Sequence, residues 1–487
     1  MNKELLPYLR SLHSLLLSIS SSQNDTEDTS MRIDLSKRLV DLLIVQLEVS
    51  QSFKDNCIDR LSKIIIRLEK ILPESDKNQL LLMDLQKICD AKSEKAYDQF
   101  LEISSKIQRK LIQLDTPKAL ELSKLLFSIE RDYCQQISEA IFAQNNLNTN
   151  SKESTSARNA RTFSTHEMTE FIQNKFPEET ETIITNATFI AGGYSKFTAD
   201  ISLAKTTSLP KNIILRGDSD DAFGGMSVVD EYQLIETVYE NGVCAPKPLA
   251  IAKNDDVFGS PFMLMEKMPG SCIGHMFDMP PIHSDSLVQD IAEKLSSIHS
   301  IPLKMVNDTT NGVDYLSSDK ALSWISSSET SWLPLNLPSP AFSAAFEWLR
   351  HNVKLYDHGP RSLVHGDYGL NNLLIEDERV TAILDWEHSH VGNPSYDLGY
   401  FHPMAETLAS WSLFLDAYAN TGVPMPDEDQ INYSILFAAT RVGVMTCQVR
   451  NAFLMNQETG IAASIGIAGD YYDVAVIRIS NALEKIL

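Results

Sequence analysis

The chain has 487 residues, and its 42 Lys and Arg against 65 Asp and Glu give a formal net charge of −23. Apolar side chains make up 43% of the sequence, with only 20 Gly and 20 Pro, as is typical of globular proteins and not of collagen-like or disordered chains. Because coating nucleic acid or anionic lipid needs a basic surface, the acidic balance argues against such a protein. It does not exclude a local basic pocket.

The six cysteines show neither a CxxC pair nor a spacing typical of metal ligands, which indicates reduced thiols in a cytoplasmic protein. They are Cys57, Cys89, Cys134, Cys244, Cys272 and Cys447. At the amino terminus, Arg10 and His13 interrupt a short apolar stretch, so an amphipathic helix is expected there rather than a signal peptide. No run approaches the roughly 18 apolar residues of a transmembrane helix, and we expect no membrane partner.

Apolar residues recur at helical spacing from about Asp34 to Ala143. The segments 80–89, 96–114 and 119–143 repeat this pattern, which predicts a helical bundle. No heptad register persists, so a long coiled coil is not expected. The role of the bundle stays open between dimerisation, docking of a protein partner and covering of an acyl chain.

Residues 145–165 are polar and contain few apolar side chains. Burial of so little apolar surface cannot offset the entropy lost on ordering the chain, which indicates a linker. After it, β-like runs at 182–184, 212–215 and 262–265 accompany a predicted helix at 228–240. From about residue 282 the pattern is mainly helical, apart from a hairpin-like passage near residue 375. The predicted order is an all-α bundle (1–145), a polar linker (146–166), a small β-rich lobe (167–268) and a larger helical lobe (269–487), an α+β architecture.

The segment from Leu363 to Phe401 carries the clearest chemical signal. Asn372 stands five positions after Asp367 of a His-Gly-Asp triplet, and two short predicted strands with a charged turn then lead to Asp385. A hairpin of this kind returns Asp385 to the loop that holds Asp367 and Asn372. Phosphoryl transfer uses such groups: one carboxylate orients and deprotonates the acceptor hydroxyl, while an amide oxygen and a second carboxylate hold Mg²⁺.

This pattern resembles the catalytic loop and metal-binding strand of the aminoglycoside phosphotransferase and choline kinase superfamily. The resemblance spans about Phe171 to Asn451 and implies a two-lobed protein-kinase-like fold, preceded by the helical bundle. It implies that Asp367 is the catalytic base and that Asn372 and Asp385 bind Mg²⁺. Glu387 is either an auxiliary metal or substrate group or a solvated carboxylate.

The resemblance also bears on three residues around the catalytic loop. His365 is expected to be structural and to bond the backbone near Asp385 rather than carry a proton. Asp397 matches a carboxylate that braces the catalytic loop through buried hydrogen bonds. Asn393 stands where related sequences usually have Asp, so the local bracing at this position is in question.

By the same resemblance, the small lobe supplies the nucleotide site. The turn with Gly192, Gly193 and Ser195 resembles the glycine-rich turn that lets backbone amides approach ATP phosphates. Arg216 ends an apolar strand where kinases place their phosphate-binding Lys, and Glu231 on the following helix is positioned to pair with it. Each feature alone would be read as an ordinary turn or surface charge, and their order along the chain favours the joint function.

Glu266 and Met268 lie where an apolar strand leads into a Pro-Gly turn. The resemblance implies that their backbone groups receive the adenine ring, although an edge strand and its exit turn would predict the same local structure. Together with the catalytic segment, these residues predict ATP and Mg²⁺ as cofactors.

The segments Ala382–Glu387 and Gly392–Leu398 are most similar to phosphotransferase domains joined to acyl-CoA dehydrogenases, a branch linked to phosphorylation of hydroxyacyl-CoA. We therefore expect a small-molecule kinase that phosphorylates a hydroxylated acyl-CoA or carboxylic acid. An aminoglycoside, macrolide or choline-type kinase with a cationic substrate is the alternative within enzymes. A catalytically silent, nucleotide-sensing protein is the alternative of another class, in which the bundle mediates homo-oligomerisation or binding of a partner.

Overall fold

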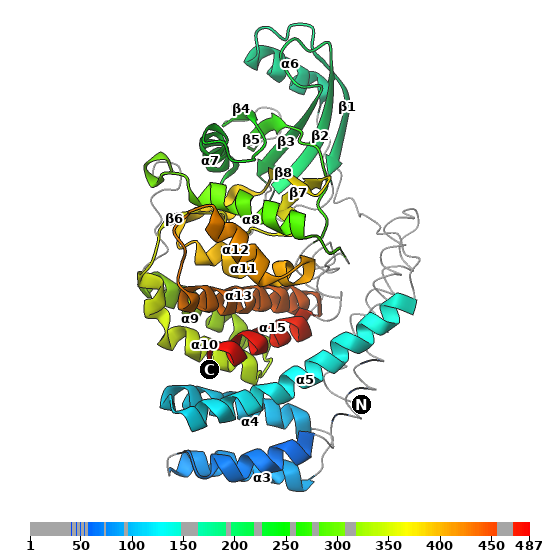
Figure 1. Ribbon diagram of the computed structural model, residues 1–487. Coiled ribbons are helices and arrows are strands. Elements are labelled where there is room, and N and C mark those ends of the chain that lie inside the picture. The colour runs from blue at the N-terminus through cyan, green and yellow to red at the C-terminus, as the bar shows by residue number, and fades with distance from the viewer. Residues whose placement is uncertain are drawn as a thin grey trace. The chain divides into compact units, whose positions relative to one another are not determined.

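A computed structural model describes residues 40, 45, 49, 53, 57–72, 75–91, 96–147, 164–190, 196–218, 226–253, 260–274, 282–306, 318–454 and 471–487 (Figure 1). The chain forms two compact units. The first contains residues 1–156, 318–355 and 432–487, and the second contains 157–317 and 356–431. The domain bounds expected from the sequence stay predictions, but this division groups 318–355 and 432–487 with the N-terminal helices.

The described part of the first unit is helical. Its helices are α3 (Asp76–Ala91), α4 (Ala96–Leu114), α5 (Pro117–Leu147), α9 (Ser318–Trp332), η2 (Leu333–Leu335), α10 (Pro340–His351), most of α13 (Glu428–Leu454) and α15 (Tyr471–Ile486), with η3 (Val353–Asp357) at its boundary. Phe100, Leu111 and Leu122 belong to one apolar core and are fully buried. Burial of such helix faces removes apolar surface from water and supplies most of the stability of the helices.

The second unit begins with α6 (Thr165–Lys175) and contains a five-stranded antiparallel sheet (Figure 1). Its strands are β1 (Ile183–Ile190), β2 (Lys196–Ala204), β3 (Asn212–Asp218), β4 (Pro248–Ala252) and β5 (Phe262–Glu266), in the order β1-β2-β3-β5-β4. In this register Arg216 of β3 lies opposite Thr198 of β2, and Asp218 lies opposite Lys196.

The two faces of the sheet have different partners, because successive side chains of a strand point to opposite faces. One face packs against Met168 and Ile172 of α6 through Ala199, Ile201, Ile213 and Leu215. The other face carries Lys196, Arg216 and Asp218. Helix α7 (Val228–Glu240) lies on this second face, since its Glu231 contacts Arg216 at 3.2 Å.

The rest of the second unit is a set of helices and two small strand pairs. They are α8 (Asp285–His299), η1 (Leu303–Met305), β6 (Ser362–Val364) paired with β9 (His390–Gly392), η4 (Leu370–Asn372), β7 (Leu373–Glu376) paired with β8 (Arg379–Ile383), η5 (Trp386–His388), α11 (Ser395–Leu408) and α12 (Trp411–Asn420). The β7–β8 pair is the hairpin expected near residue 375.

The α+β fold class predicted from the sequence is confirmed. All six cysteines lie among the described residues and are free thiols. No helix in the described ranges has both the length and the apolar character needed to cross a bilayer. The amphipathic helix expected at the amino terminus lies outside the described residues, as do residues 148–163 of the expected linker.

Candidate active site

The loop after β6 holds Asp367 in a backbone conformation that requires glycine before it. Gly366 has a φ of +83°, and a Cβ at this position would lie 2.2 Å from the His388 carbonyl oxygen. Because an L side chain fits neither that conformation nor that space, the glycine of the His-Gly-Asp triplet is a steric requirement. The close approach also keeps the Asp367 loop against the segment that follows Asp385.

Asp397 of α11 holds the same loop through hydrogen bonds from its backbone amides. Its carboxylate accepts hydrogen bonds from the amides of His365 (2.7 Å) and Gly366 (2.9 Å), and it contacts His299 Nε2 at 3.0 Å. Burial alone would raise the pKa of Asp397, but the bonds from His299 and the backbone lower it below its usual range, so the group is a carboxylate. The bracing role expected for Asp397 is what the geometry shows.

His365 connects the Asp367 loop to the strand that leads to Asp385. Its Nε2 lies 2.9 Å from the carbonyl oxygen of Leu384, and its Nδ1 lies 3.3 Å from the Asp367 amide. Burial lowers the pKa of His365, so the ring is neutral, donates from Nε2 and accepts at Nδ1. This is the structural role expected from the sequence.

Asn393 contributes a bond that the usual aspartate at this position could not form. Its Oδ1 accepts from the Ser395 amide at 2.9 Å, and its Nδ2 donates to the His358 carbonyl oxygen at 3.2 Å. The amide therefore keeps the local bracing and adds a donor for the loop at His358.

The β7–β8 hairpin brings Asn372 and Asp385 together, as predicted. Leu373 pairs with Ile383, and the Leu384 amide donates to the Asn372 carbonyl oxygen at 2.8 Å. Asn372 Nδ2 lies 2.8 Å from Asp367 Oδ2, which leaves Asn372 Oδ1 directed away from Asp367. Asp385 has a φ of 64°, a left-handed conformation that is uncommon for residues other than glycine and frequent at functional sites.

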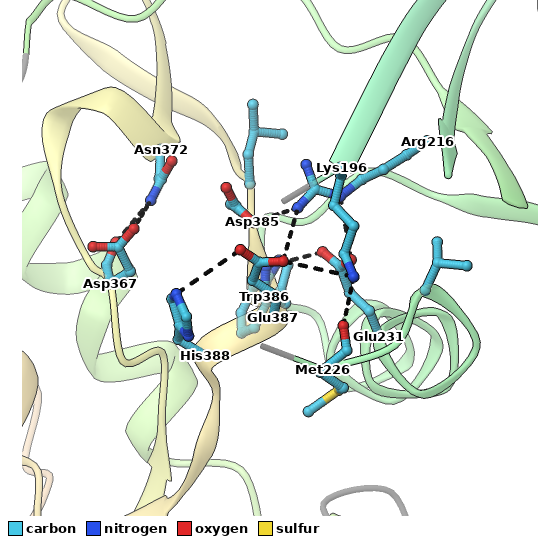
Figure 2. A network of polar contacts seen from close by, with 12 residues as sticks. Lys196, Arg216, Met226, Glu231, Asp367, Asn372, Asp385, Trp386, Glu387 and His388 are labelled. Atoms are coloured by element: carbon cyan, nitrogen blue, oxygen red, sulfur yellow. Dashed lines mark hydrogen bonds and ion pairs between the residues drawn. The ribbon is translucent and has the colours of Figure 1, made fainter. Parts of the chain in front are cut away.

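Arg216 joins the sheet, α7 and the Asp385 segment (Figure 2). Its Nε contacts Glu231 Oε2 at 3.2 Å, and its Nη2 bonds Asp385 Oδ1. Glu231 is fully buried and also accepts from the Trp386 amide at 3.2 Å. The pairing of Arg216 with Glu231 predicted from the sequence is therefore present, and the direct bond between Arg216 and Asp385 was not predicted.

Burial and neighbouring charges shift the pKa values of Arg216 and Glu231 in opposite directions. Burial disfavours the guanidinium charge, but the carboxylates of Glu231, Asp385 and Glu387 outweigh it and raise the pKa of Arg216 above its ordinary value. For Glu231, burial raises the pKa, and the Arg216 charge opposes that shift. Arg216 is therefore a permanent cation at the centre of the cluster.

Lys196 is the site residue that the sequence analysis missed. Its Nζ lies 2.6 Å from Asp218 Oδ1, 2.6 Å from the Met226 carbonyl oxygen and 3.6 Å from Glu387 Oε2. A lysine after a glycine-rich turn is a weak signal by itself. Its position on the strand face of Arg216 follows only from the register of β2 and β3.

The remaining nucleotide-site predictions are only partly described. Gly192, Gly193 and Ser195 lie outside the described residues. Glu266 ends β5, with its amide bonded to the Lys247 carbonyl oxygen at 2.9 Å, and Met268 follows directly. The contact of both residues with a nucleotide base stays a prediction.

The oxygen atoms near Asp385 fit a magnesium ion. Asn372 Oδ1 and the Asp385 carboxylate are the hard donors that Mg²⁺ prefers, with waters and phosphate oxygens completing its shell. Within the described ranges, no three His, Cys, Asp or Glu side chains form a group that could hold a metal, so these two donors do not make a closed protein cage. The side chain of Asp385 is 31% exposed, whereas that of Glu387 is only 8% exposed and lies 4.0 Å from Arg216.

Known proteins match parts of this chain in sequence and in fold. Residues 226–431 match the phosphotransferase enzyme family. Acyl-CoA dehydrogenase family member 11 of Rattus norvegicus is 28% identical over 208 residues, which cover 41% of this chain and 26% of that protein. Acyl-CoA dehydrogenase family member 10 of Mus musculus is 29% identical over 179 residues, covering 35% of this chain and 16% of that protein.

The fold has a counterpart among solved structures. A crystal structure from Ralstonia eutropha that is assigned to the aminoglycoside phosphotransferases aligns with a TM-score of 0.52 at 18% identity. The alignment covers 66% of this chain and 99% of that one. The chain spans only 26% and 16% of the lengths of these two acyl-CoA dehydrogenase relatives, so the likeness concerns one region of those proteins. The match to the phosphotransferase enzyme family, over residues 226–431, contains Glu231 and the whole segment from Asp367 to Asp397.

Proposed function

We propose that this chain transfers the γ-phosphoryl group of ATP to the hydroxyl group of a small molecule. The observation that carries the proposal is the convergence of Asp367, Asn372, Asp385 and Arg216 (Figure 2). Asp367 and Asn372 are bonded to each other, and Asp385 is bonded to a permanent cation. These are the groups that phosphoryl transfer requires.

Each side chain has a separate task in this proposal. Asp367 orients the acceptor hydroxyl and takes its proton, while the amide of Asn372 fixes the Asp367 carboxylate through the bond to Oδ2. Asn372 Oδ1 and Asp385 would hold Mg²⁺, which neutralises charge on the phosphates when it is bound. Arg216 presents its guanidinium to the phosphates and is itself oriented by Glu231.

The charge of the cluster supports binding of a divalent cation. Two cations and four carboxylates give a formal sum of −2, from Lys196 and Arg216 against Asp218, Glu231, Asp385 and Glu387. Glu231 is 1% exposed and Glu387 is 8% exposed, whereas Asp385 is 31% exposed. Asp385 is therefore the carboxylate that an entering ion could reach most readily.

For the acceptor we propose a hydroxylated acyl-CoA or carboxylic acid. The support is the identity of 28% to a relative named as an acyl-CoA dehydrogenase family member, since a kinase domain on such a protein would act on a related acyl compound. The experiment must distinguish this acyl acceptor from a cationic acceptor such as an aminoglycoside or choline.

The test is consumption of ATP over a panel of hydroxyacyl-CoAs, hydroxy acids, aminoglycosides and choline. We expect turnover with a hydroxyacyl compound, and Asp367→Asn should lower kcat by a factor of about 10² to 10⁴, the usual contribution of a general base. Glu376→Gln, at the exposed end of β7, is the matched control and should keep wild-type turnover. Turnover only with cationic acceptors would reject the acyl substrate, and wild-type turnover in Asp367→Asn would reject the role of Asp367.

A further inference from the structure

Lys196 is buried among three acceptors that come from three different segments. Its side chain is 3% exposed, and its ammonium contacts Asp218 of β3, the Met226 carbonyl oxygen before α7, and Glu387 of η5 (Figure 2). An ammonium has three N–H donors and no acceptor, so the number of donors equals the number of acceptors. Lys196 donates hydrogen bonds to Asp218 and Met226 and forms an ion pair with Glu387, so its ammonium is occupied by protein groups.

Both groups that Lys196 contacts at 2.6 Å are connected to the start of α7. Asp218 accepts from the Val228 amide at 3.2 Å, and the Met226 amide donates to the Glu387 carbonyl oxygen at 2.9 Å. Lys196 and Asp218 thus fix two consecutive parts of the helix start. Glu231 lies one turn farther along α7 and holds Arg216 at 3.2 Å, so the position of the helix start determines where Arg216 is held.

Glu387 is arranged as a counter-ion. Its Oε2 lies 3.6 Å from Lys196 and 4.0 Å from Arg216, and its Oε1 lies 3.8 Å from His388 Nε2. A buried carboxylate between two cations is already compensated, whereas Asp385 is four times more exposed. The metal role considered for Glu387 from the sequence is therefore less well supported than that of Asp385.

We propose that Lys196 is a positioning residue of the nucleotide site, which fixes the first turn of α7 and the Glu387 carboxylate and thereby sets the direction of Arg216. The proposal rests on the proposed function where it concerns the nucleotide. The part of the proposal that concerns structure, namely that Lys196 fixes the start of α7 and the Glu387 carboxylate, can be tested without any ligand. In this arrangement Glu387 is the counter-ion of Lys196 and is not a Mg²⁺ ligand.

The first experiment is amide hydrogen exchange on ligand-free Lys196→Met, which removes the charge and keeps the length of the side chain. We expect faster exchange in residues 226–231 and 386–388. The amides of Val228 and Met226 donate to Asp218 and Glu387, and both acceptor residues lose their contact with the Lys196 ammonium in the variant. Lys211→Met, an exposed lysine next to β3, is the matched control and should leave the exchange unchanged. Unchanged exchange in 226–231, or an equal increase over all five strands, would overturn the positioning role.

The second experiment measures binding of Mg²⁺-ADP by calorimetry. In Lys196→Met we expect affinity to fall on the order of tenfold, because the effect reaches the phosphates through Arg216 and not by direct contact. Adding Glu387→Gln to Lys196→Met should recover part of this loss, because it removes the carboxylate left without its cation. A double variant that binds no better than Lys196→Met would contradict the pairing.

The third measurement separates Glu387 from the metal. Glu387→Gln alone should leave the Mg²⁺ concentration needed for half-maximal ADP affinity within about twofold of wild type, whereas Asp385→Asn should raise it by more than tenfold. An equal shift in both variants would make Glu387 a metal ligand and overturn that part of the proposal. If wild-type protein fails to bind Mg²⁺-ADP, the proposed function fails, and the exchange experiment alone decides the role of Lys196.

Discussion

Arg216 holds two carboxylates with different nitrogen atoms of one planar group. Nε faces Glu231 and Nη2 faces Asp385, so the guanidinium fixes the distance between α7 and the Asp385 segment. A lysine has a single ammonium on a flexible stem and lacks the fork that serves two partners at once. At this position Arg and Lys are not equivalent, although both carry one positive charge.

Arg216→Lys should therefore raise the KM for ATP about tenfold, because an interaction of 1 to 2 kcal/mol is lost when one carboxylate loses its charged partner. We expect a smaller fall in kcat, since Asp367 and Asn372 keep their bond. Steady-state kinetics with ATP as the varied substrate checks this split. Arg379→Lys, where the arginine bonds Asp290 instead, is the control, and an equal change in both variants would contradict the argument.

The residues of the catalytic segment were predictable because their signal is local. Asp367 and Asn372 lie five positions apart, and a short hairpin links them to Asp385. Lys196 could not be found in this way, because its partners Asp218 and Glu387 are joined to it only by tertiary structure. The bond between Arg216 and Asp385 was missed for the same reason.

At the scale of elements, the turn between β2 and β3 is organised by one carboxylate. Glu179 accepts hydrogen bonds from the amides of Thr207 (2.7 Å), Ser208 (2.5 Å) and Leu209 (2.8 Å). Burial alone would raise the pKa of Glu179, but these bonds and the Thr182 hydroxyl lower it from 4.5 to about 2. The turn is thus held to the segment before β1 by the charged form of Glu179.

A lowered pKa in the folded state makes stability depend on pH at the acid end. The Glu179 contribution is complete above about pH 4.5 and is lost as pH falls toward 2, where the folded state also takes up the proton. Glu179→Gln should therefore lower Tm at pH 6 by a few degrees, about 2 to 4 °C per kcal/mol for larger domains, and the loss should shrink toward pH 2. Thermal unfolding followed by circular dichroism tests this, with Glu181→Gln at a nearby exposed position as control. A pH-independent difference would refute the assignment.

Two helices with a clear periodic pattern were predicted with their ends, whereas α3 and α5 extend beyond the predicted 80–89 and 119–143. Helices α4 and α7 have the predicted bounds of 96–114 and 228–240. The pairing of β6 with β9 could not be predicted. Each strand has only three residues, and 25 residues that include the loop with Asp367 separate the two strands in the sequence. Such short strands carry too few side chains for a pattern of period two.

At the scale of the whole molecule, the N-terminal helices are part of a unit that includes the end of the chain. Glu130 of α5 accepts from the Ala341 amide at the start of α10 (2.9 Å) and from the Tyr472 hydroxyl of α15 (2.8 Å). These contacts join segments that are more than 200 residues apart in the sequence. Local periodicity cannot reveal such a grouping, which is why the sequence analysis treated 1–145 as a separate appendage.

Glu130 also gives this unit a pH dependence of opposite sign to that of Glu179. Burial raises the pKa of Glu130 from 4.5 to about 7, although bonds from Ser339, Ala341 and Tyr472 favour the charged form. Between pH 4.5 and 7 the folded state keeps a proton that the unfolded chain has released, so stability falls as pH rises and is constant above 7.

Glu130→Gln should remove this dependence, because an amide does not titrate. Ala341 and Tyr472 bond different oxygens of the Glu130 carboxylate, and a glutamine keeps only one oxygen, so the variant loses one of these bonds at every pH. We therefore expect the Tm of the variant relative to wild type to increase from pH 5 to pH 8 by a few degrees, about 2 to 4 °C per kcal/mol for larger domains. Unfolding scans at both pH values measure this, and Glu139→Gln on the exposed side of α5 is the control. A Tm difference from wild type that stays constant or decreases from pH 5 to pH 8 would contradict the sign.

The contact between Gly366 and the His388 carbonyl oxygen has a consequence for how this chain can be recombined with its relatives. Residues 362 to 392 close on themselves through the β6–β9 pairing, the bond from His365 to Leu384, and the bond from Ser389 Oγ to the His365 carbonyl oxygen (3.1 Å). A chimaera that exchanges only the half with Asp367, or only the half with Asp385, would combine contact surfaces from two different proteins. Grafts should therefore be cut outside residues 362 and 392, so that the whole segment is exchanged together.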